Sequence, residues 1–169
     1  GNISSCGGST VSGGYYNTSS DYFSTVGGGY YNTSSSCYST VGGGQQNTIL
    51  TGSPNSTISG GECNTILTGS THSTIGGGLC NTSSGISSSI LGGQNNTSIG
   101  DRSAVVGGQG IVATENDMTY MPSANIQSIG YLYFGDVNTD GSWRMRISGS
   151  TFIIEKRVGG VWVTSGTFV

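Results

Sequence analysis

Polar and hydrophobic positions recur together about every fifteen residues over the first two thirds of the chain. An Asn marks each unit, and the steps between successive Asn residues are 15, 15, 15, 17, 17 and 15. These residues are Asn2, Asn17, Asn32, Asn47, Asn64, Asn81 and Asn96. A β-branched residue follows each Asn, and this second set is Val11, Val26, Val41, Ile58, Ile75, Ile90 and Val105. A fixed internal period of this kind is the signature of a repeat architecture.

The repeat predicts one coil of a parallel β-solenoid, with two short strands and two turns in each unit. Side chains alternate between faces along a strand, so in the segment S-T-V we expect Ser24 and Val26 to point inward and Thr25 outward. The Gly run that follows allows the unusual backbone angles of a tight corner. We expect the repeated Asn side chains to form an internal ladder, each side-chain amide hydrogen-bonding to the next.

The two longer units are adjacent and share their extra material. The segments are I-L-T-G-S-P-N at 49–55 and I-L-T-G-S-T-H at 66–72. Insertions at the same place in neighbouring coils can stack on each other. We therefore predict a small two-layer protrusion, with aliphatic side chains covering one another at its base. These side chains are Ile49, Leu50, Ile66 and Leu67.

The repeat fades after Gly110, and the last part of the chain has the composition of ordinary β-strands. Longer apolar segments at 126–134, 142–148, 151–158 and 161–169 are separated by Gly- and Asp-containing turns. They predict an antiparallel meander. Trp143, Met145 and Ile147 alternate with Arg144 and Arg146, so we expect the first set to be buried and the arginines to face water.

The chain is therefore expected to be all-β, with seven solenoid coils over residues 1–110, a connector over 111–123 and a small antiparallel domain over 124–169. Each coil buries about one aliphatic side chain, worth roughly 1.5–3 kcal/mol. Ordering its backbone costs on the order of 1–2 kcal/mol per residue. A single column is marginal on these figures. We expect three copies to assemble as a homotrimer that covers apolar faces and sheet edges.

Composition and charge argue against two classes of function, nucleic-acid binding and membrane insertion. Only 8% of the residues are charged, and residues 1–100 contain just Asp21 and Glu62 as charged residues. The net charge is −3, with no basic stripe, so we expect no nucleic-acid partner. No apolar run is long enough to span a bilayer, so we also expect no membrane insertion.

The four cysteines are Cys6, Cys37, Cys63 and Cys80, and their spacing fits no zinc pattern. Cys63 and Cys80 each directly precede a repeat Asn, so they should stack on neighbouring coils. Two interpretations remain open for this pair. The thiols form a disulfide, or they are separate small apolar groups.

The pattern N-T-x-S-x-x-x-S-T-V-G-G-G resembles the head repeats of YadA-type trimeric autotransporter adhesins, which form a left-handed parallel β-roll. The autotransporter heads usually have slightly shorter coils. Related repeats occur in fibre proteins of viruses and bacteriophages. The stretch Y-L-Y-F-G-D-V-N-T-D-G-S-W-R looks like a segment of phage tail fibres near the C-terminal tip. The resemblance implies a virion or cell-surface location, other fibre or virion proteins as partners, and a host-surface receptor.

Asp136, Asn138 and Asp140, followed by Gly141, match the opening of a calcium loop. Ile147 stands at the twelfth position, where the loop requires a Glu. A hairpin turn, in which Asp and Asn bond their own backbone, is the better interpretation. We therefore expect no metal and no cofactor.

His72 is the only histidine, and the neighbouring coils supply no acid except Glu62. A hydrolytic triad needs a base, a nucleophile and an acid together, so we expect a surface histidine and no enzyme. Sequons such as Asn17-Thr18-Ser19 coincide with the repeat Asn. A glycan there would break the ladder, so we interpret these residues as structural.

Tyrosines of the first coils form candidate ligand-binding columns. Two pairs share repeat positions, and two further tyrosines lie near another turn. Exposed rings flanked by Asn, Ser and Gln suit stacking on sugar rings, so a glycan is the candidate ligand. Packing of the rings on one another for stability alone is the simpler interpretation. The candidate residues are Tyr15, Tyr16, Tyr22, Tyr30, Tyr31 and Tyr38.

Two functions are consistent with the sequence. The first is a structural and adhesive segment of a trimeric virion fibre or surface adhesin. The alternative is a free-standing ligand-binding solenoid, such as an ice-binding protein, suggested by two Thr columns. Ice-binding faces need two Thr ranks close together, whereas here S-T-V and N-T lie on different strands. The columns are Thr10, Thr25, Thr40, Thr57 and Thr74, and Thr18, Thr33, Thr48, Thr65, Thr82 and Thr97.

Overall fold

The computed structural model describes residues 1–122, 131–134, 138–148 and 151–168. The chain forms two compact units, Gly1–Pro122 and Ser123–Val169. The first is a parallel β-solenoid and the second contains a small antiparallel sheet, so the predicted all-β fold class is confirmed. Among the described residues, no helix is long and apolar enough to cross a membrane.

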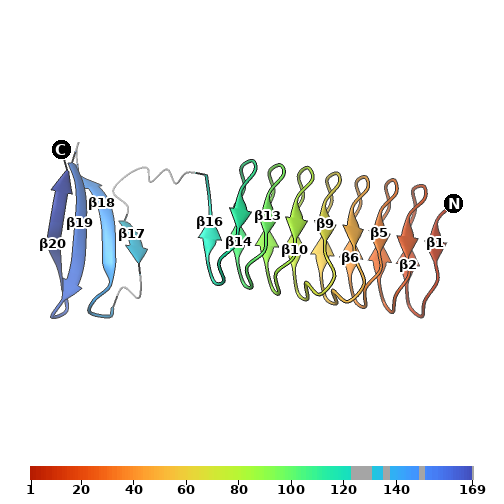
Figure 1. Ribbon diagram of the computed structural model, residues 1–169, viewed down its shortest axis with the longest axis horizontal. Coiled ribbons are helices and arrows are strands. Elements are labelled where there is room, and N and C mark those ends of the chain that lie inside the picture. Colours follow the sequence, from red (N-terminus) through yellow and green to blue (C-terminus); the bar gives the residue numbers. More distant parts are fainter. Residues whose placement is uncertain (123–130, 135–137, 149–150, 169) are drawn as a thin grey trace. The chain divides into compact units, whose positions relative to one another are not determined.

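Two eight-stranded parallel sheets run along the solenoid, and each coil contributes one two-residue strand to each sheet (Figure 1). The odd-strand sheet contains β1 (Ile3–Ser4), β3 (Thr18–Ser19), β5 (Thr33–Ser34), β7 (Thr48–Ile49), β9 (Thr65–Ile66), β11 (Thr82–Ser83), β13 (Thr97–Ser98) and β15 (Val112–Ala113). The even-strand sheet contains β2 (Thr10–Val11), β4 (Thr25–Val26), β6 (Thr40–Val41), β8 (Thr57–Ile58), β10 (Thr74–Ile75), β12 (Ser89–Ile90), β14 (Ala104–Val105) and β16 (Thr119–Tyr120). Equivalent residues pair directly, as Thr18 does with Thr33, so the coils stack in register.

Two corners connect the strands of each coil, and they lie along opposite edges of the solenoid (Figure 1). We call the corner after the odd-numbered strand the Ser corner, which spans residues 20–24 in the second coil. The Gly corner follows the even-numbered strand and spans residues 27–31 in that coil. A third, one-residue parallel ladder runs along the Gly corners from Tyr15 through Tyr30 to Gln109.

The solenoid has eight coils, so the prediction of a connector over residues 111–123 is wrong for its first ten residues. Val112 pairs with Thr97, and Thr119 pairs with Ala104. The eighth coil escaped detection because Ile111 replaces the repeat Asn and Tyr120 replaces the inward Val. Ile111 still donates its backbone N–H to Asn96 Oδ1, at 3.0 Å.

The last coil also closes the C-terminal end of the solenoid. Pro122 lies against Gly108. A Cβ added at Gly108 would lie 3.0 Å from Cγ of the Pro122 ring. The Tyr120 hydroxyl accepts a hydrogen bond from the Glu115 backbone N–H at 3.1 Å. Proline has no N–H to offer to a further strand, and repeat arrays need an atypical terminal unit to cover their exposed end.

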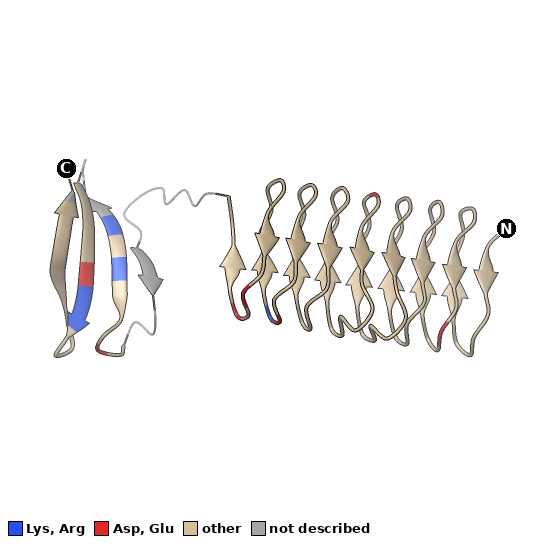
Figure 2. Ribbon diagram, viewed as in Figure 1, with Lys and Arg blue, Asp and Glu red and all other residues tan. Residues whose placement is uncertain are grey.

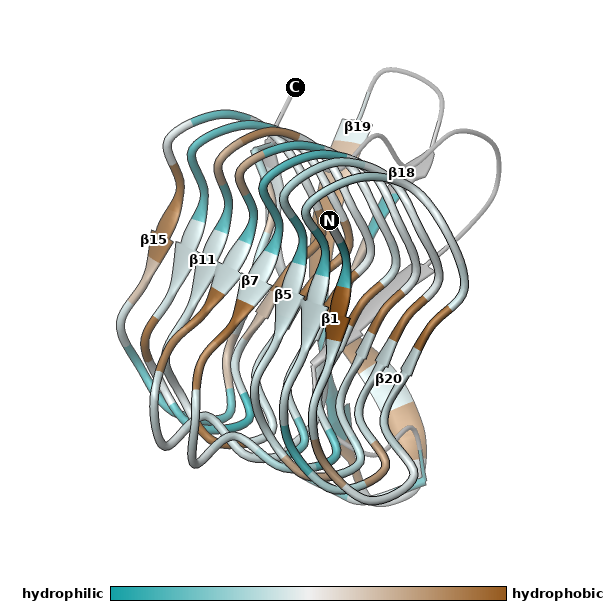
Figure 3. Cartoon of the chain, turned by 90° about the vertical axis from the view of Figure 1, so that its right-hand side faces the viewer, coloured by the Kyte–Doolittle hydropathy of each residue, from teal (hydrophilic) through white to brown (hydrophobic). Residues whose placement is uncertain are grey.

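The interior is a narrow file of aliphatic and Ser side chains. Val26, Val41 and their equivalents as far as Val105 are fully buried, as predicted for Ile58 and Ile75. In the fifteen-residue coils the opposite strand contributes a buried Ser, such as Ser19, whose hydroxyl lies 2.7 Å from that of Ser24. The coils lie one behind another (Figure 3), and their inward positions pair directly, as Val26 does with Val41. Hydroxyl pairs therefore fill a space too narrow for two aliphatic side chains.

The two seventeen-residue coils replace this buried Ser by Ile. Ile49 and Ile66 pair with each other and are fully buried in the core. The prediction that they lie at the base of a protrusion is therefore wrong, whereas Leu50 and Leu67 are half-exposed beside them. The inserted residues do stack, because Gly69 donates its N–H to the Gly52 carbonyl at 3.2 Å. The added length thus accompanies a larger core residue.

The predicted Asn ladder exists, but it runs mainly through the backbone. Asn32 is fully buried, and its Nδ2 donates to the carbonyls of Gly28 at 2.9 Å and Gly44 at 2.8 Å. Its Oδ1 accepts the backbone N–H of Asn47 at 2.9 Å. Side-chain amides bond to each other only at the long coils, where Asn64 Nδ2 lies 3.0 Å from Asn47 Oδ1. Pairing the amide with Gly carbonyls satisfies both of its donors.

The Gly that precedes each such Asn by three residues cannot be replaced. Gly29 has φ of 92°, a conformation that only Gly adopts readily. A Cβ at this position would collide with the Gly44 carbonyl oxygen and would lie 2.7 Å from Asn32 Nδ2. Gly at this position is therefore a condition for stacking of the coils.

Most corners also contain one non-glycine residue in the left-handed region. Thirteen non-glycine residues have φ between 53° and 60°. They occupy two repeat positions. One directly precedes the repeat Asn, as Tyr31 does, and the other directly precedes the last residue of the Ser corner, as Phe23 does. This conformation turns the N–H toward the preceding coil. Tyr31 donates to the Tyr15 carbonyl at 3.1 Å, whereas strand residues such as Thr18 donate to the following coil. Each coil is thus bonded in both directions, which offsets a strain of about 1–2 kcal/mol per residue.

The second unit is the predicted antiparallel meander. Its strands are β17 (Tyr131–Phe134), β18 (Trp143–Ser148), β19 (Thr151–Val158) and β20 (Val161–Phe168), paired in sequence order. The prediction for its two faces is wrong. Arg144 and Arg146 are 14% and 27% exposed and both bond the buried Glu155, whereas Trp143 is 39% exposed. Ile147 lies outside the residues whose side chains are described.

Cross-strand register explains this reversal. Arg144 lies directly opposite Glu155, and its Nε donates to Glu155 Oε2 at 2.6 Å. The Arg144 guanidinium also lies 4.5 Å from the ring centre of Trp162. Arginine stems and an aromatic ring together cover the carboxylate. Alternation alone identified the two faces correctly, but the register was needed to show which one is covered.

We expect replacement of Asn32 by Ala to destabilise the solenoid strongly. The Gly28 carbonyl and the Asn47 N–H would lose this partner in a buried site, and the Gly44 carbonyl would keep only the Tyr30 N–H. The cost is on the order of 3 kcal/mol or more. Thermal unfolding followed by far-UV circular dichroism measures the effect. Thr33→Ala, which changes the outward neighbour on the same strand, is the matched control and should shift Tm little. Equal Tm values for the two variants would show that the Asn bonds contribute nothing.

We also expect the second unit to lose stability in acid through Glu155. Burial raises the pKa of this carboxyl, but hydrogen bonds and charge from Arg144 and Arg146 outweigh it, so the pKa is lowered overall. A lowered folded-state pKa gives stability that is present above the ordinary value of about 4.3 and is lost as the pH falls through the folded value. Both tryptophans lie in this unit, so their fluorescence reports its unfolding. Glu155→Gln should flatten the acid limb, and an unchanged limb would contradict this role.

Candidate binding surface

Four tyrosines form one aromatic cluster on the Gly corners of the first two coils. Tyr15 and Tyr30 stack with ring centres 6.1 Å apart, and Tyr16 and Tyr31 stack at 4.9 Å. Within each corner the two rings meet edge to face, at 4.2 Å for Tyr15 with Tyr16. The four side chains are 41–55% exposed. We call these residues the tyrosine quartet.

The repeat itself builds the quartet. Tyr15 and Tyr30 are neighbours on the one-residue ladder, which sets the spacing of their rings. Tyr16 and Tyr31 follow in the left-handed conformation, with φ of 54° at both, so their rings turn beside the first pair. The pKa of Tyr15 is raised, chiefly by its side-chain hydrogen bond with Tyr16. The quartet therefore presents flat ring faces and hydroxyl groups at the surface.

The six candidate tyrosines do not form one site. Tyr22 and Tyr38 lie on the Ser corners, at the opposite edge of the solenoid from the quartet. Tyr38 stacks on Phe23, with ring centres 5.2 Å apart and an interplanar angle of 10°. Phe23 and Tyr38 make a second, separate aromatic cluster.

Phe23 is a member of this second cluster that the sequence analysis missed. It is 55% exposed, and its ring lies over Gly8 in the preceding coil. Phe23 and Tyr38 each stand six residues after a repeat Asn, so their shared position was visible in the sequence. The sequence analysis considered tyrosines alone and placed Tyr22 and Tyr38 near the same turn.

Both aromatic columns end after the first coils. At the Gly corner the tyrosines give way to Gln45 and Gln46, and then to Glu62 and Cys63. The backbone geometry continues unchanged, so the change is one of side-chain chemistry. The surface of the solenoid is therefore aromatic toward its N-terminal end.

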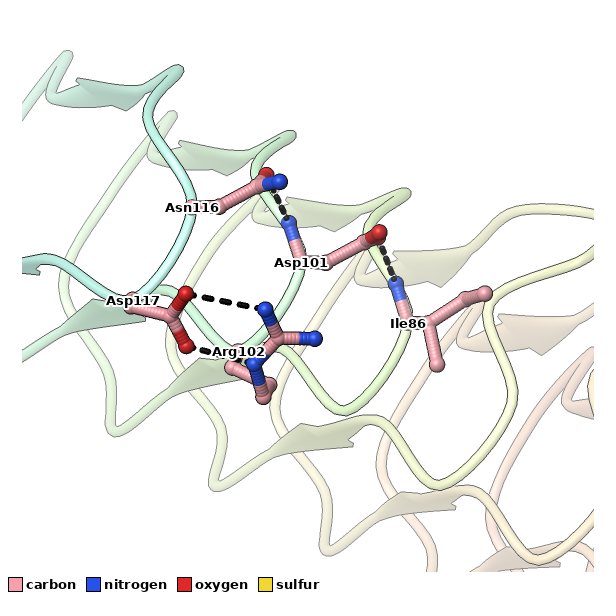
Figure 4. Close-up of polar contacts among 5 residues, drawn as sticks. All are labelled: Ile86, Asp101, Arg102, Asn116 and Asp117. Atoms are coloured by element: carbon pink, nitrogen blue, oxygen red, sulfur yellow. Dashed lines mark hydrogen bonds and ion pairs between the residues drawn. The ribbon is translucent and has the colours of Figure 1, made fainter.

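The Ser corners of the last coils have a polar ladder in place of rings (Figure 4). Asp101 Oδ1 accepts the Ile86 backbone N–H at 2.8 Å, and Asn116 Oδ1 accepts the Asp101 N–H at 2.8 Å. Beside it, Arg102 forms a two-pronged ion pair with Asp117 and lowers the pKa of that carboxyl through this hydrogen bond. Figure 2 shows charged residues of the solenoid at its corners. The Arg102–Asp117 ion pair is exposed, so it adds little stability.

The Thr columns lie on different sheets, as the sequence indicated. Thr18 and its equivalents through Thr97 form one outward rank on the odd-strand sheet. The other rank, from Thr10 to Thr74, lies on the even-strand sheet. Each sheet therefore carries a single Thr file.

The candidate catalytic residues His72 and Glu62 are not brought together, and the candidate calcium loop is described only in part. Asp136 lies outside the described residues, and the Asp140 carboxylate accepts the Gly159 and Gly160 N–H groups at 2.8 and 3.0 Å. Where the structure is described, no three His, Cys, Asp or Glu residues cluster as metal ligands. His72 lies on a Ser corner, whereas Glu62 lies on a Gly corner.

The sequon residue Asn17 is fully buried, and its side chain donates to the carbonyls of Gly13 and Gly29. Its role within the described coils is structural. The outward surfaces that remain as candidate sites are thus the quartet, the second aromatic cluster and the faces of the sheets.

A scan against models of known protein families gives no match for this chain. A search of curated proteins gives no match either.

Proposed function

We propose that this chain is a structural and adhesive segment of a trimeric extracellular fibre, on a virion or a bacterial surface, that contacts a host-surface receptor. The observation that carries the proposal is the unbroken register of the eight coils. Each coil bonds its neighbours on both sides, so the solenoid extends in one direction without a hinge. At about 4.8 Å per rung, eight rungs give a stiff segment roughly 35–40 Å long.

Exposed apolar residues that directly follow the even-numbered strands support assembly from several copies. Leu91, Val106 and Met121 occupy one repeat position on successive coils and are 63%, 44% and 47% exposed. In earlier coils this position is Gly or Ser, which leaves a flat surface. A flat face with an apolar end allows close approach by an identical face, and homo-oligomers with cyclic symmetry use such repeated contacts.

The second unit points to the same arrangement. On one face of its sheet, Trp143, Val158, Val161 and Val163 are 39–61% exposed. A single-layer sheet of this size must cover an apolar face to be stable. In a trimer, the apolar faces of three copies of this unit would cover one another.

The tyrosine quartet is the proposed contact with a receptor, and a glycan is the proposed ligand. Four rings held by the backbone offer apolar faces for sugar rings, and their hydroxyl groups offer polar edges. Little side-chain entropy remains to be lost on binding, because each ring is already stacked on its neighbour. Ring packing for stability alone remains the competing interpretation of the same contacts.

A free-standing ice-binding solenoid is the second candidate, and the regular Thr rank on the odd-strand sheet is the observation that favours it. One Thr file per sheet and two longer coils disfavour a flat ice-binding face. Marked thermal hysteresis of the purified chain would replace the fibre proposal by this one.

We expect the chain to have a solution mass of about 51 kDa, three times its 17.1 kDa. Multi-angle light scattering in dilute solution measures this mass. Val106→Lys should dissociate the trimer, because it places a charge in the apolar column. Thr48→Lys, on the odd-strand sheet, is the matched control and should leave the mass unchanged. A folded wild-type monomer at micromolar concentration would refute trimerisation.

We expect the double substitution Tyr15→Ala with Tyr30→Ala to weaken attachment to glycans or host cells at least about tenfold, as loss of a central aromatic contact does. A glycan array and a cell-attachment assay measure it. Tyr22→Ala, at the opposite corner, is the control that should bind normally. If the double variant binds like wild type while only its Tm falls, the quartet is structural and not a glycan site.

A further inference from the structure

Two cysteines occupy the same repeat position on consecutive coils. Cys63 and Cys80 both lie at Gly corners, one residue after the bridged pair Glu62 and Leu79. Both adopt the left-handed conformation, with φ of 56° and 53°. Cys63 donates its N–H to the Gln45 carbonyl at 3.0 Å, and Cys80 donates to the Glu62 carbonyl at 2.9 Å. Equal backbone geometry sends the two side chains outward in the same direction, one above the other.

The spacing of the coils suits a covalent link between these thiols. Neighbouring rungs of a parallel sheet are about 4.8 Å apart, which lies within the range of roughly 4.4–6.8 Å between the Cα atoms of disulfide-bonded residues. Cys63 Sγ donates to Gln46 Oε1 at 3.4 Å. Burial, followed by a side-chain hydrogen bond and charge from Cys80, raises the pKa of Cys63. Both cysteines are in the thiol form in this structure.

The other two cysteines are held apart from this pair and from each other. Cys37 Sγ donates to Asp21 Oδ1 at 3.3 Å, on the Ser corners. Cys6 lies two coils before Cys37, with the coil that carries Asp21 between them. They provide an internal control, because their separation forbids a bond within one chain.

We propose that Cys63 and Cys80 form a modification site, at which a small-molecule disulfide oxidises them to an intrachain disulfide between the two seventeen-residue coils. Cys80 is exposed and Cys63 is half-buried, so Cys80 reacts first. Its thiolate attacks one sulfur of the reagent and expels one thiolate. Cys63 then loses its proton to solvent, and its thiolate attacks Cys80 Sγ in the mixed disulfide. The second reagent thiolate leaves. Two protein thiols are oxidised, and one reagent disulfide is reduced to two thiols.

The bond would close the coil Asn64–Cys80 into a covalent ring. This coil and the one before it are where the repeat changes length and where the Asn side chains bond each other directly. A stack of coils opens most readily where its regularity changes, because each coil is held only by its neighbours. The link would therefore secure that part of the solenoid against local opening.

The test treats the full chain with oxidised glutathione at pH 8.5, quenches it with acid and counts free thiols with Ellman's reagent after denaturation. We expect the count to fall from four to two, with one linked peptide joining Cys63 to Cys80 in mass spectrometry. Tm should rise by about 5–10 °C on oxidation and return on reduction. The single variants Cys63→Ser and Cys80→Ser should each show no intrachain link and no gain in Tm.

Three results would overturn the proposal. Four thiols could remain after oxidation, the linked peptide could join other cysteines, or the link could form only between chains on a non-reducing gel. The order of reaction has its own readout. In the native chain, Cys80 of the Cys63→Ser variant should react faster with Ellman's reagent than Cys63 of the Cys80→Ser variant, and the opposite order would contradict the stated sequence of steps.

Discussion

The buried Asn side chain is the interaction on which the rest of the solenoid depends. Each coil has little apolar material to hide, so hydrophobic burial alone cannot hold it. Asn32 donates to one Gly carbonyl in the corner before it and to another in the Gly corner that ends its own coil, and its Oδ1 accepts the N–H of the next Asn. The bond to the Gly44 carbonyl is possible only because Gly29, in the coil before, has no side chain. Asn and Gly thus act together: the Asn side chain forms the hydrogen bonds, and the Gly leaves the space for them.

Much of this could be predicted from the sequence because the repeat displays it many times. The period, the inward Val and Ser positions and the meander followed from alternation and spacing. The sequence did not predict two kinds of detail, the hydrogen-bond acceptors of the Asn amides and the covered face of the meander. Both depend on residues in other parts of the chain. The Asn amides turned to Gly carbonyls instead of to one another, and Glu155 selected the Arg144 face as the covered one. The eighth coil was hidden because Ile111 and Tyr120 take over positions that carry the repeat signature elsewhere.

The surface shows the same division between periodic and individual features. Repeat spacing correctly paired Tyr15 with Tyr30 and Tyr16 with Tyr31. It could also have paired Phe23 with Tyr38, had all aromatic residues been aligned. Separation of the two aromatic clusters required knowledge of which corner each residue occupies. In a solenoid the backbone brings equivalent positions together regardless of residue type, so a run of like residues in one column becomes a surface. The proposed adhesive, assembly and disulfide sites are all such columns.

Amide hydrogen exchange tests the stacking of the coils most directly. The backbone N–H groups of Asn32, Asn47, Asn64, Asn81 and Asn96 each bond the Oδ1 of the preceding repeat Asn. If buried Asn side chains join every coil to the next, these amides should exchange as slowly as those of the most protected strand residues, and Asn64→Ala should speed exchange at Asn81 first. Rapid exchange of the Asn amides in the intact protein, at the rate of exposed turns, would contradict the stacking by Asn and Gly.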